Sequence, residues 1–200
     1  MLKIGITGGI GSGKTYICQI IEKMGYQVFY SDIEAKKLMS NNIELIKRIK
    51  KIIGENTYIN GEINKPIIRA FLFKNEQNKE TLNEIIHPFV FQEFEQWSKL
   101  KKEEIIFNES ALLFETGSYK RFDKIILITA PEEVKVNRLI KRDQLIREEI
   151  VKRFQAQLDD TIKKQKADYI IDNNDKELLI PQINKILNEL TTNYTSSKSS

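Results

Sequence analysis

A phosphate-binding loop near the amino terminus constrains this chain more than any other feature. Residues 8–15 read Gly-Gly-Ile-Gly-Ser-Gly-Lys-Thr, a complete G-x-x-x-x-G-K-[ST] pattern. The apolar residues 2–7 before it favour a strand, and residues 16–21 after it favour an amphipathic helix. The pattern requires this order of strand, loop and helix. The sequence therefore predicts a site for the phosphates of a nucleotide.

Each residue type in the loop has a physical role. Glycines let the backbone curl so that successive N–H groups point at phosphate oxygens, beside the positive end of the following helix. Lys14 is expected to be exposed and to bring its charge to the β- and γ-phosphates, while Thr15 binds the Mg²⁺ that accompanies ATP or GTP. The expected nucleotide-binding residues are Gly9, Gly11, Ser12, Gly13, Lys14, Thr15 and Tyr16.

Composition narrows the class of protein. A chain of 200 residues can bury one core but is too short for two ordinary domains. The net charge of +4 is smaller than a dedicated nucleic-acid binder usually carries, and the single cysteine, Cys18, is expected to be a buried apolar residue. The sequence shows no secretion signal and no membrane-spanning run. We expect a cytoplasmic monomer or weak homo-oligomer without nucleic-acid or membrane partners.

The spacing of apolar runs predicts an α/β fold. Short β-branched runs recur between helical patterns, and they are continuous rather than alternating, as in a parallel sheet covered by helices on both faces. The runs are residues 2–7, 27–30, 105–107, 125–128 and 169–171. Together with the phosphate loop they predict the three-layer α/β/α parallel sheet of a P-loop NTPase.

Two stretches between the strands are too long for simple crossovers. Residues 33–102 carry helical patterns without a convincing strand and predict a helical subdomain, and residues 138–166 form a second, highly charged helical stretch. Pro66 suits the first turn of a helix, whereas Pro88 is expected to end one near Ile86. The core then comprises about residues 1–32, 103–137 and 167–190. The Ser/Thr-rich segment 191–200 lacks periodicity and is expected to be disordered.

The rest of the chain decides between classes of nucleotide-using protein. A GTPase would carry an N-K-x-D guanine reader and a D-x-x-G switch, and neither string occurs. The length suits a small-molecule kinase better than a large ATPase. Two classes stay open on these grounds. One is a kinase of a nucleoside or another small acceptor, and the other is a nucleotide-dependent switch or binding protein.

Two carboxylates follow predicted strands. Asp32 comes after the second strand, where the carboxyl ends of parallel strands border the ligand crevice. It could accept the proton of an attacking hydroxyl, or it could cap the helix that begins at Ile33. Glu109 ends the third strand and could hold Mg²⁺ through water, or it could be an ordinary charged strand end.

Basic residues raise a similar choice. Arg138 and Arg142 are four residues apart and share one face of a helix. That face could neutralise the charge on a transferred phosphoryl group, or it could be a solvated face in a region crowded with charges. His87, the only histidine, could contact a substrate or could have a purely structural role.

These pieces together resemble the dephospho-coenzyme A kinase family. The resemblance begins with residues 4–14 and continues with Ser31-Asp32 after the second strand and with His87-Pro88. It then runs through Leu112-Leu113-Phe114-Glu115, Arg138, Arg142-Asp143, Arg153, Gln157 and the final-strand run Ala167-Asp168-Tyr169-Ile170-Ile171-Asp172-Asn173. The matches extend in order from the first strand to about Leu190.

The resemblance implies ATP-dependent phosphorylation of the ribose 3′-hydroxyl of dephospho-coenzyme A. Residues 33–102 would form the substrate-binding subdomain, and residues 138–166 a lid. Asp32 would be the base or orienter of the hydroxyl, and Lys14 would act with Arg138 and Arg142 on the phosphoryl group. The implied substrate-binding residues are Thr7, Asp32, His87, Glu109 and Arg153, and the implied metal ligands are Thr15 and Glu109, the latter through water.

The chain departs from the family pattern at two places. The family commonly has D-x-P before L-L-F-E, whereas this chain has Glu109-Ser110-Ala111, which lengthens the side chain by one methylene and removes the restraint of proline. Asn173-Asn174-Asp175 replaces the usual Asn followed by a small residue and Gly. Neither departure touches the loop or Asp32.

Overall fold

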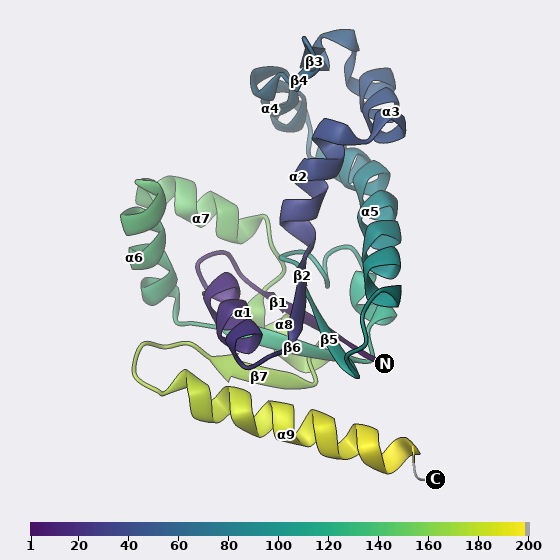
Figure 1. The fold of residues 1–200 in the computed structure, drawn as a ribbon. Helices are drawn as coiled ribbons and strands as arrows, with labels where there is room; N and C mark the ends of the chain where they lie inside the picture. The colour runs from purple at the N-terminus through teal and green to yellow at the C-terminus, as the bar shows by residue number, and fades with distance from the viewer. Residues whose placement is uncertain (199–200) are drawn as a thin grey trace. The chain divides into compact units, whose positions relative to one another are not determined.

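The computed structural model describes residues 1–198 (Figure 1). The chain divides into two compact units, one formed by residues 1–29 and 102–200 and the other by residues 30–101. Within the described part of the chain, none of the helices combines the length and the apolar content that crossing a membrane would need.

The first unit is built on a five-stranded sheet with the order β2-β5-β1-β6-β7. β1 pairs in parallel with both β5 and β6, and β6 pairs in parallel with β7. The strands are β1 (Leu2–Gly8), β2 (Gln27–Tyr30), β5 (Ile105–Glu109), β6 (Lys124–Thr129) and β7 (Tyr169–Asp172). The predicted parallel α/β sheet is confirmed, because buried β-branched runs form the strands.

Helices and turns cover both faces of this sheet. α1 (Lys14–Lys23) packs on β1 and β5 and contacts α9 (Leu179–Lys198), which also packs on β7 (Figure 1). Ile125 and Leu127 alternate with Ile126 along β6 and pack on the other side against Leu113 and Phe114. The remaining elements of this unit are η2 (Ser118–Arg121), α6 (Glu132–Asp143), α7 (Arg147–Gln155) and α8 (Asp160–Lys166).

The second unit is mainly helical. Its elements are α2 (Ser31–Asn41), α3 (Ile43–Ile53), η1 (Glu55–Thr57), β3 (Tyr58–Ile59), β4 (Glu62–Ile63), α4 (Lys65–Lys74) and α5 (Glu76–Lys99). Pro66 lies in the first turn of α4, as predicted. The prediction of a segment without strands is wrong in detail, because β3 and β4 pair as an antiparallel hairpin and the Tyr58 hydroxyl donates to the Met39 carbonyl at 2.7 Å.

Two predicted ends of helices are also wrong. α5 continues through Pro88, since Ile86 before it and Val90 after it are both buried and tertiary packing outweighs the lost backbone hydrogen bond. The tail expected to be disordered from residue 191 continues α9 to Lys198. Leu190 is buried, and the Tyr194 hydroxyl accepts a hydrogen bond from the Met1 amino group at 2.8 Å, so residues near this end make tertiary contacts. Residues 199 and 200 lie outside the described residues.

Candidate active site

The phosphate loop joins the end of β1 to the start of α1. Ser12 N–H donates to the Gly9 carbonyl at 3.1 Å, which closes a tight turn, and α1 begins at Lys14. Gly13 has φ +91°, and a Cβ on it would lie 2.2 Å from the Asn173 side-chain nitrogen. Glycine is therefore needed at position 13 for both conformation and close approach. The first N–H groups of a helix point away from its body, so the start of α1 makes this turn suitable for an anion.

Lys14 is buried rather than exposed, which corrects the expectation from the sequence. Its ammonium group donates to the carbonyls of Gly8 at 2.8 Å and Gly9 at 3.3 Å. The loop folds over the lysine and fixes the position of its charge. Thr15 and Tyr16, on the first turn of α1, are exposed.

Two hydroxyl groups at the loop lack partners. Among the described residues, Thr7 Oγ1 and Ser12 Oγ are buried and have no hydrogen-bond partner. Buried polar atoms are normally paired, and unpaired ones mark strain or a missing ligand. These two hydroxyls therefore belong with the loop among the groups that a bound phosphate could engage.

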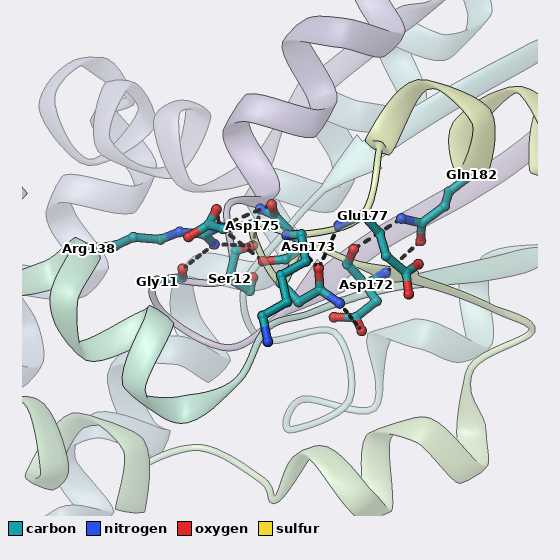
Figure 2. A network of polar contacts seen from close by, with 10 residues as sticks. Gly11, Ser12, Arg138, Asp172, Asn173, Asp175, Glu177 and Gln182 are labelled. Atoms are coloured by element: carbon teal, nitrogen blue, oxygen red, sulfur yellow. Dashed lines mark hydrogen bonds and ion pairs between the residues drawn. The ribbon is translucent and has the colours of Figure 1, made fainter.

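Arg138 binds the side of the phosphate loop on which the Gly11 and Ser12 carbonyls lie, which we call its outer side (Figure 2). Its guanidinium group donates to the carbonyls of Gly11 and Ser12, both at 3.3 Å, and to the Asn173 carbonyl at 2.9 Å. It also forms an ion pair with Asp175. The structure thus places the guanidinium of Arg138 on loop carbonyls.

Arg142 and Arg153 lie differently from Arg138. Arg142 forms a two-armed contact with its neighbour Asp143, at 2.7 and 2.8 Å, and its side chain is 65% exposed. This contact lowers the pKa of Asp143 and raises that of Arg142. Arg153 is exposed on α7. Arg138 is thus engaged with the loop, whereas the other two predicted arginines are exposed.

The loop is also held by the segment after α7. Gln157 Oε1 accepts a hydrogen bond from the Ile10 N–H at 2.9 Å. Lys135, on α6, forms an ion pair with Asp160 at 2.8 Å, and both charged groups lie next to Gly9. Both ends of the predicted lid are therefore attached to the loop.

Asn173, Lys135 and Asp160 were not predicted from the sequence as site residues, and Gln157 was only quoted in a motif. The available signal in the sequence was the resemblance of two motifs to the family pattern, namely the run of residues 167–173 and the pair Arg153 and Gln157. The loop residues that Gln157 and Asn173 bind lie more than a hundred positions away in the sequence, so a local pattern cannot assign these contacts.

Glu109 is buried at the end of β5, beside Ile6 of β1. Burial, together with the negative charge of Glu109, raises the pKa of the Cys18 thiol, although Lys14 opposes this effect. Cys18 is therefore an inert buried thiol, as expected. Ser110, the middle residue of the Glu109-Ser110-Ala111 run, donates its N–H to the Ile6 carbonyl at 3.0 Å and extends the strand pairing.

The Leu112-Leu113-Phe114-Glu115 run packs beneath the sheet. Leu113 and Phe114 are core residues, and Glu115 forms an ion pair at 2.8 Å with the fully buried Lys163 of α8. Glu115 also accepts from the Leu158 N–H at 3.1 Å. The run therefore anchors the last part of the predicted lid, which comprises residues 138–166.

In the second unit, Asp32 lies in the first turn of α2 and is exposed. The N-cap of α2 is Tyr30, so the alternative in which Asp32 caps a helix beginning at Ile33 is wrong. Burial lowers the pKa of the partly buried His87, and the negative charge of Asp32 partly opposes this shift. α2 packs on α5, which places these two predicted substrate residues in one electrostatic environment.

The sheet, the loop and the helix that follows it define a P-loop nucleotide-binding protein with the fold of small-molecule kinases. The model of the family "Dephospho-CoA kinase" matches residues 2–178. The chain therefore belongs to the dephospho-CoA kinase family.

Individual relatives agree with this assignment. A dephospho-CoA kinase of Bacteroides fragilis is 38% identical over 187 residues, 93% of this chain and 91% of the relative. The crystal structure of a protein from Thermus thermophilus superimposes with a TM-score of 0.81 at 26% identity, covering 96% of this chain and 97% of the other. A dephospho-CoA kinase from Campylobacter jejuni gives a TM-score of 0.66, also at 26% identity, covering 98% of each chain.

Proposed function

We propose that this protein transfers the γ-phosphoryl group of ATP to the ribose 3′-hydroxyl of dephospho-CoA, giving CoA and ADP. The observation that carries the proposal is the complete phosphate loop, with its lysine fixed by loop carbonyls, in a member of this family. Both substrates are small molecules, so the reaction needs neither a nucleic acid nor a membrane, and we assign it to the cytoplasm.

The donor half of the reaction belongs to the loop. Its N–H groups and Lys14 hold the phosphates, and Thr15 and Glu109 would hold Mg²⁺. Within the described residues, no three His, Cys, Asp or Glu side chains gather to form a metal cage. That donor set fits Mg²⁺, which usually binds through phosphates, waters and one or two protein oxygens. When bound, Mg²⁺ neutralises charge on the phosphates.

The acceptor half of the reaction is assigned to Asp32. An exposed carboxylate can orient the 3′-hydroxyl and take its proton as the oxygen attacks phosphorus. His87, whose lowered pKa keeps it neutral near pH 7, would contact the acceptor through hydrogen bonds rather than charge. Thr7 and Arg153 are proposed to bind substrate, and Arg142 to neutralise the transferred group.

An assay of ADP release with dephospho-CoA tests the proposal. Asp32→Asn removes the proton acceptor with little change in shape, so we expect turnover to fall about 10²- to 10⁴-fold. The affinity for ATP should stay unchanged. The matched control is Glu34→Gln, a neighbouring carboxamide change on the same helix, which should keep full activity.

A panel of acceptors separates the remaining classes. Preference for a nucleoside or nucleotide without the pantetheine arm would show a different kinase. Tight GTP binding with slow hydrolysis and no acceptor would show a switch protein. Either result would refute the proposed substrate.

A further inference from the structure

The carbonyl side of the phosphate loop is capped by two side chains from elsewhere in the same unit. Arg138 of α6 reaches the carbonyls of Gly11 and Ser12, and the Asn173 side-chain nitrogen donates to the Ser12 carbonyl at 2.8 Å. Figure 2 shows Arg138 and Asn173 converging on this turn. The Ser12 carbonyl therefore receives two donors, one of them cationic.

The Ser12 carbonyl shares its peptide group with an N–H donor expected to face the phosphates. That donor is the Gly13 N–H. The Gly11 carbonyl belongs instead to the same peptide as the Ser12 N–H, which donates to the Gly9 carbonyl and closes the turn. A donor on a peptide carbonyl fixes the plane of that peptide and polarises its N–H group. Arg138 and Asn173 can thus act on a phosphate through the loop, without touching it.

We call Arg138 and Asn173 the clamp, and further hydrogen bonds hold these two side chains in one arrangement. Asn173 is buried, its N–H donates to the Thr129 carbonyl at 2.8 Å, and its side-chain oxygen accepts from Arg138 at 3.1 Å. The amide nitrogen of Asn173 is therefore turned toward Ser12, in the space left by the absent Cβ of Gly13. Asp175 pairs with Arg138 on the solvent side, where its side chain is 64% exposed.

We propose that Arg138 and Asn173 are positioning residues that preorganise the phosphate loop for the β-phosphate from its outer side. This role differs from neutralising the phosphoryl group in flight. Preorganised donors stabilise charge without rearranging when the ligand binds or reacts. The inference rests on the proposed function for the identity of the donor nucleotide, but the clamp itself needs only a ligand with a diphosphate.

Ligand binding without the acceptor tests this role separately from the proposed reaction. We would measure the dissociation constants of Mg²⁺-ADP and of Mg²⁺-pyrophosphate by calorimetry for the full chain. The variants are Arg138→Met, which keeps the length of the side chain, and Asn173→Ala. Asp175→Asn is the matched control, because it removes the negative charge of the exposed partner of Arg138, keeps its Oδ1 acceptor and leaves the contacts to the loop.

We expect Arg138→Met and Asn173→Ala each to raise the dissociation constants of both ligands about tenfold, as for the loss of a charge-assisted or buried hydrogen bond. For the Asp175→Asn control, both dissociation constants should stay within twofold of those of the unchanged protein. The affinity of the double variant should fall by less than the product of the two single fold-changes, since both side chains act on the Ser12 carbonyl. Melting without ligand, followed by circular dichroism, identifies the temperature at which every variant is folded. Asn173→Ser replaces Asn173→Ala if that variant does not fold.

Two results would overturn the inference. Unchanged ADP and pyrophosphate binding in Arg138→Met, with turnover reduced 10³-fold, would show that Arg138 acts only on the transferred group. Weaker ADP binding with unchanged pyrophosphate binding would show that Arg138 contacts the nucleoside instead of supporting the loop.

Discussion

At the scale of single residues, the phosphate loop shows how a short pattern specifies a local conformation. Gly11 and Gly13 adopt positive φ angles, and Lys14 turns back onto the carbonyls of the loop. These features depend only on neighbours in the sequence. The expected nucleotide site could therefore be located from the sequence, although the burial of Lys14 could not.

Lys14→Met is expected to lower turnover about 10²- to 10³-fold, because a preorganised charge at the phosphates is lost. Methionine keeps the length and apolar stem of the side chain. The free energy of unfolding without ligand should therefore fall by no more than about 3 kcal/mol, the upper net value of a hydrogen bond to a charged group. Steady-state kinetics and urea unfolding measure the two effects. A variant that keeps normal turnover would remove Lys14 from the reaction.

The contacts of Asn173 and Gln157 show where prediction from sequence ends. Asn173 binds a residue 161 positions away, and Gln157 binds one 147 positions away. The sequence showed both residues within family-like runs, but only the folded chain brings them to the loop. Such contacts depend on the order of the strands, which the apolar runs did not specify.

At the scale of elements, the errors of prediction have clear physical causes. Asn60-Gly61 is a strong signal for a two-residue hairpin, and both residues have positive φ as this turn requires. The flanking strands are only two residues each, too short for an alternating pattern. Pro88 is tolerated because the same helix packs against α2, α3 and α4.

Packing of α2 on α5 predicts a pH effect. The pKa of His87 is lowered from its ordinary value of 6.5, so the folded state favours the neutral ring. The unfolded chain then binds more protons, and stability falls as the pH drops through 6.5 toward the folded-state pKa. We expect His87→Gln to flatten the dependence of the urea midpoint on pH between about pH 7 and 5. An identical slope in both proteins would contradict this account.

The ion pair between Glu115 and Lys163 joins the turn after β5 to α8. Lys163 is fully buried, so removing its partner leaves an uncompensated charge inside the protein. Glu115→Ala should lower the free energy of unfolding by about 3 kcal/mol, measured with urea. Glu115→Gln should cost less, because it can still accept from the Leu158 N–H. Equal losses in both variants would mean that the hydrogen bond from the Leu158 N–H contributes nothing beyond the charge of Glu115.

At the scale of the whole molecule, the two units divide the proposed reaction. The phosphate loop, its clamp and Glu109 lie in the first unit, whereas Asp32 and His87 lie in the second. The first unit has its own sheet and buried core, and residues 30–101 form one continuous insertion. Donor binding should therefore be separable from acceptor chemistry.

Replacing residues 31–101 with a flexible Gly/Ser linker tests this division. Long surface insertions contribute little to the closure cost of the remaining chain, so we expect the first unit to stay folded. It should bind Mg²⁺-pyrophosphate within about tenfold of the full chain, a difference of about 1.4 kcal/mol. Phosphorylation of dephospho-CoA should be lost, because Asp32 and His87 are absent.

Full-length Asp32→Asn is the control for that experiment, since it loses the proposed proton acceptor while keeping both units. If the shortened chain unfolds, or folds without binding pyrophosphate, the first unit depends on the insertion for its phosphate site. If it folds and binds, the loop and its clamp are sufficient for the donor phosphates. The insertion then supplies the chemistry of the acceptor, so changes in residues 30–101 should alter acceptor choice without altering the affinity for ADP.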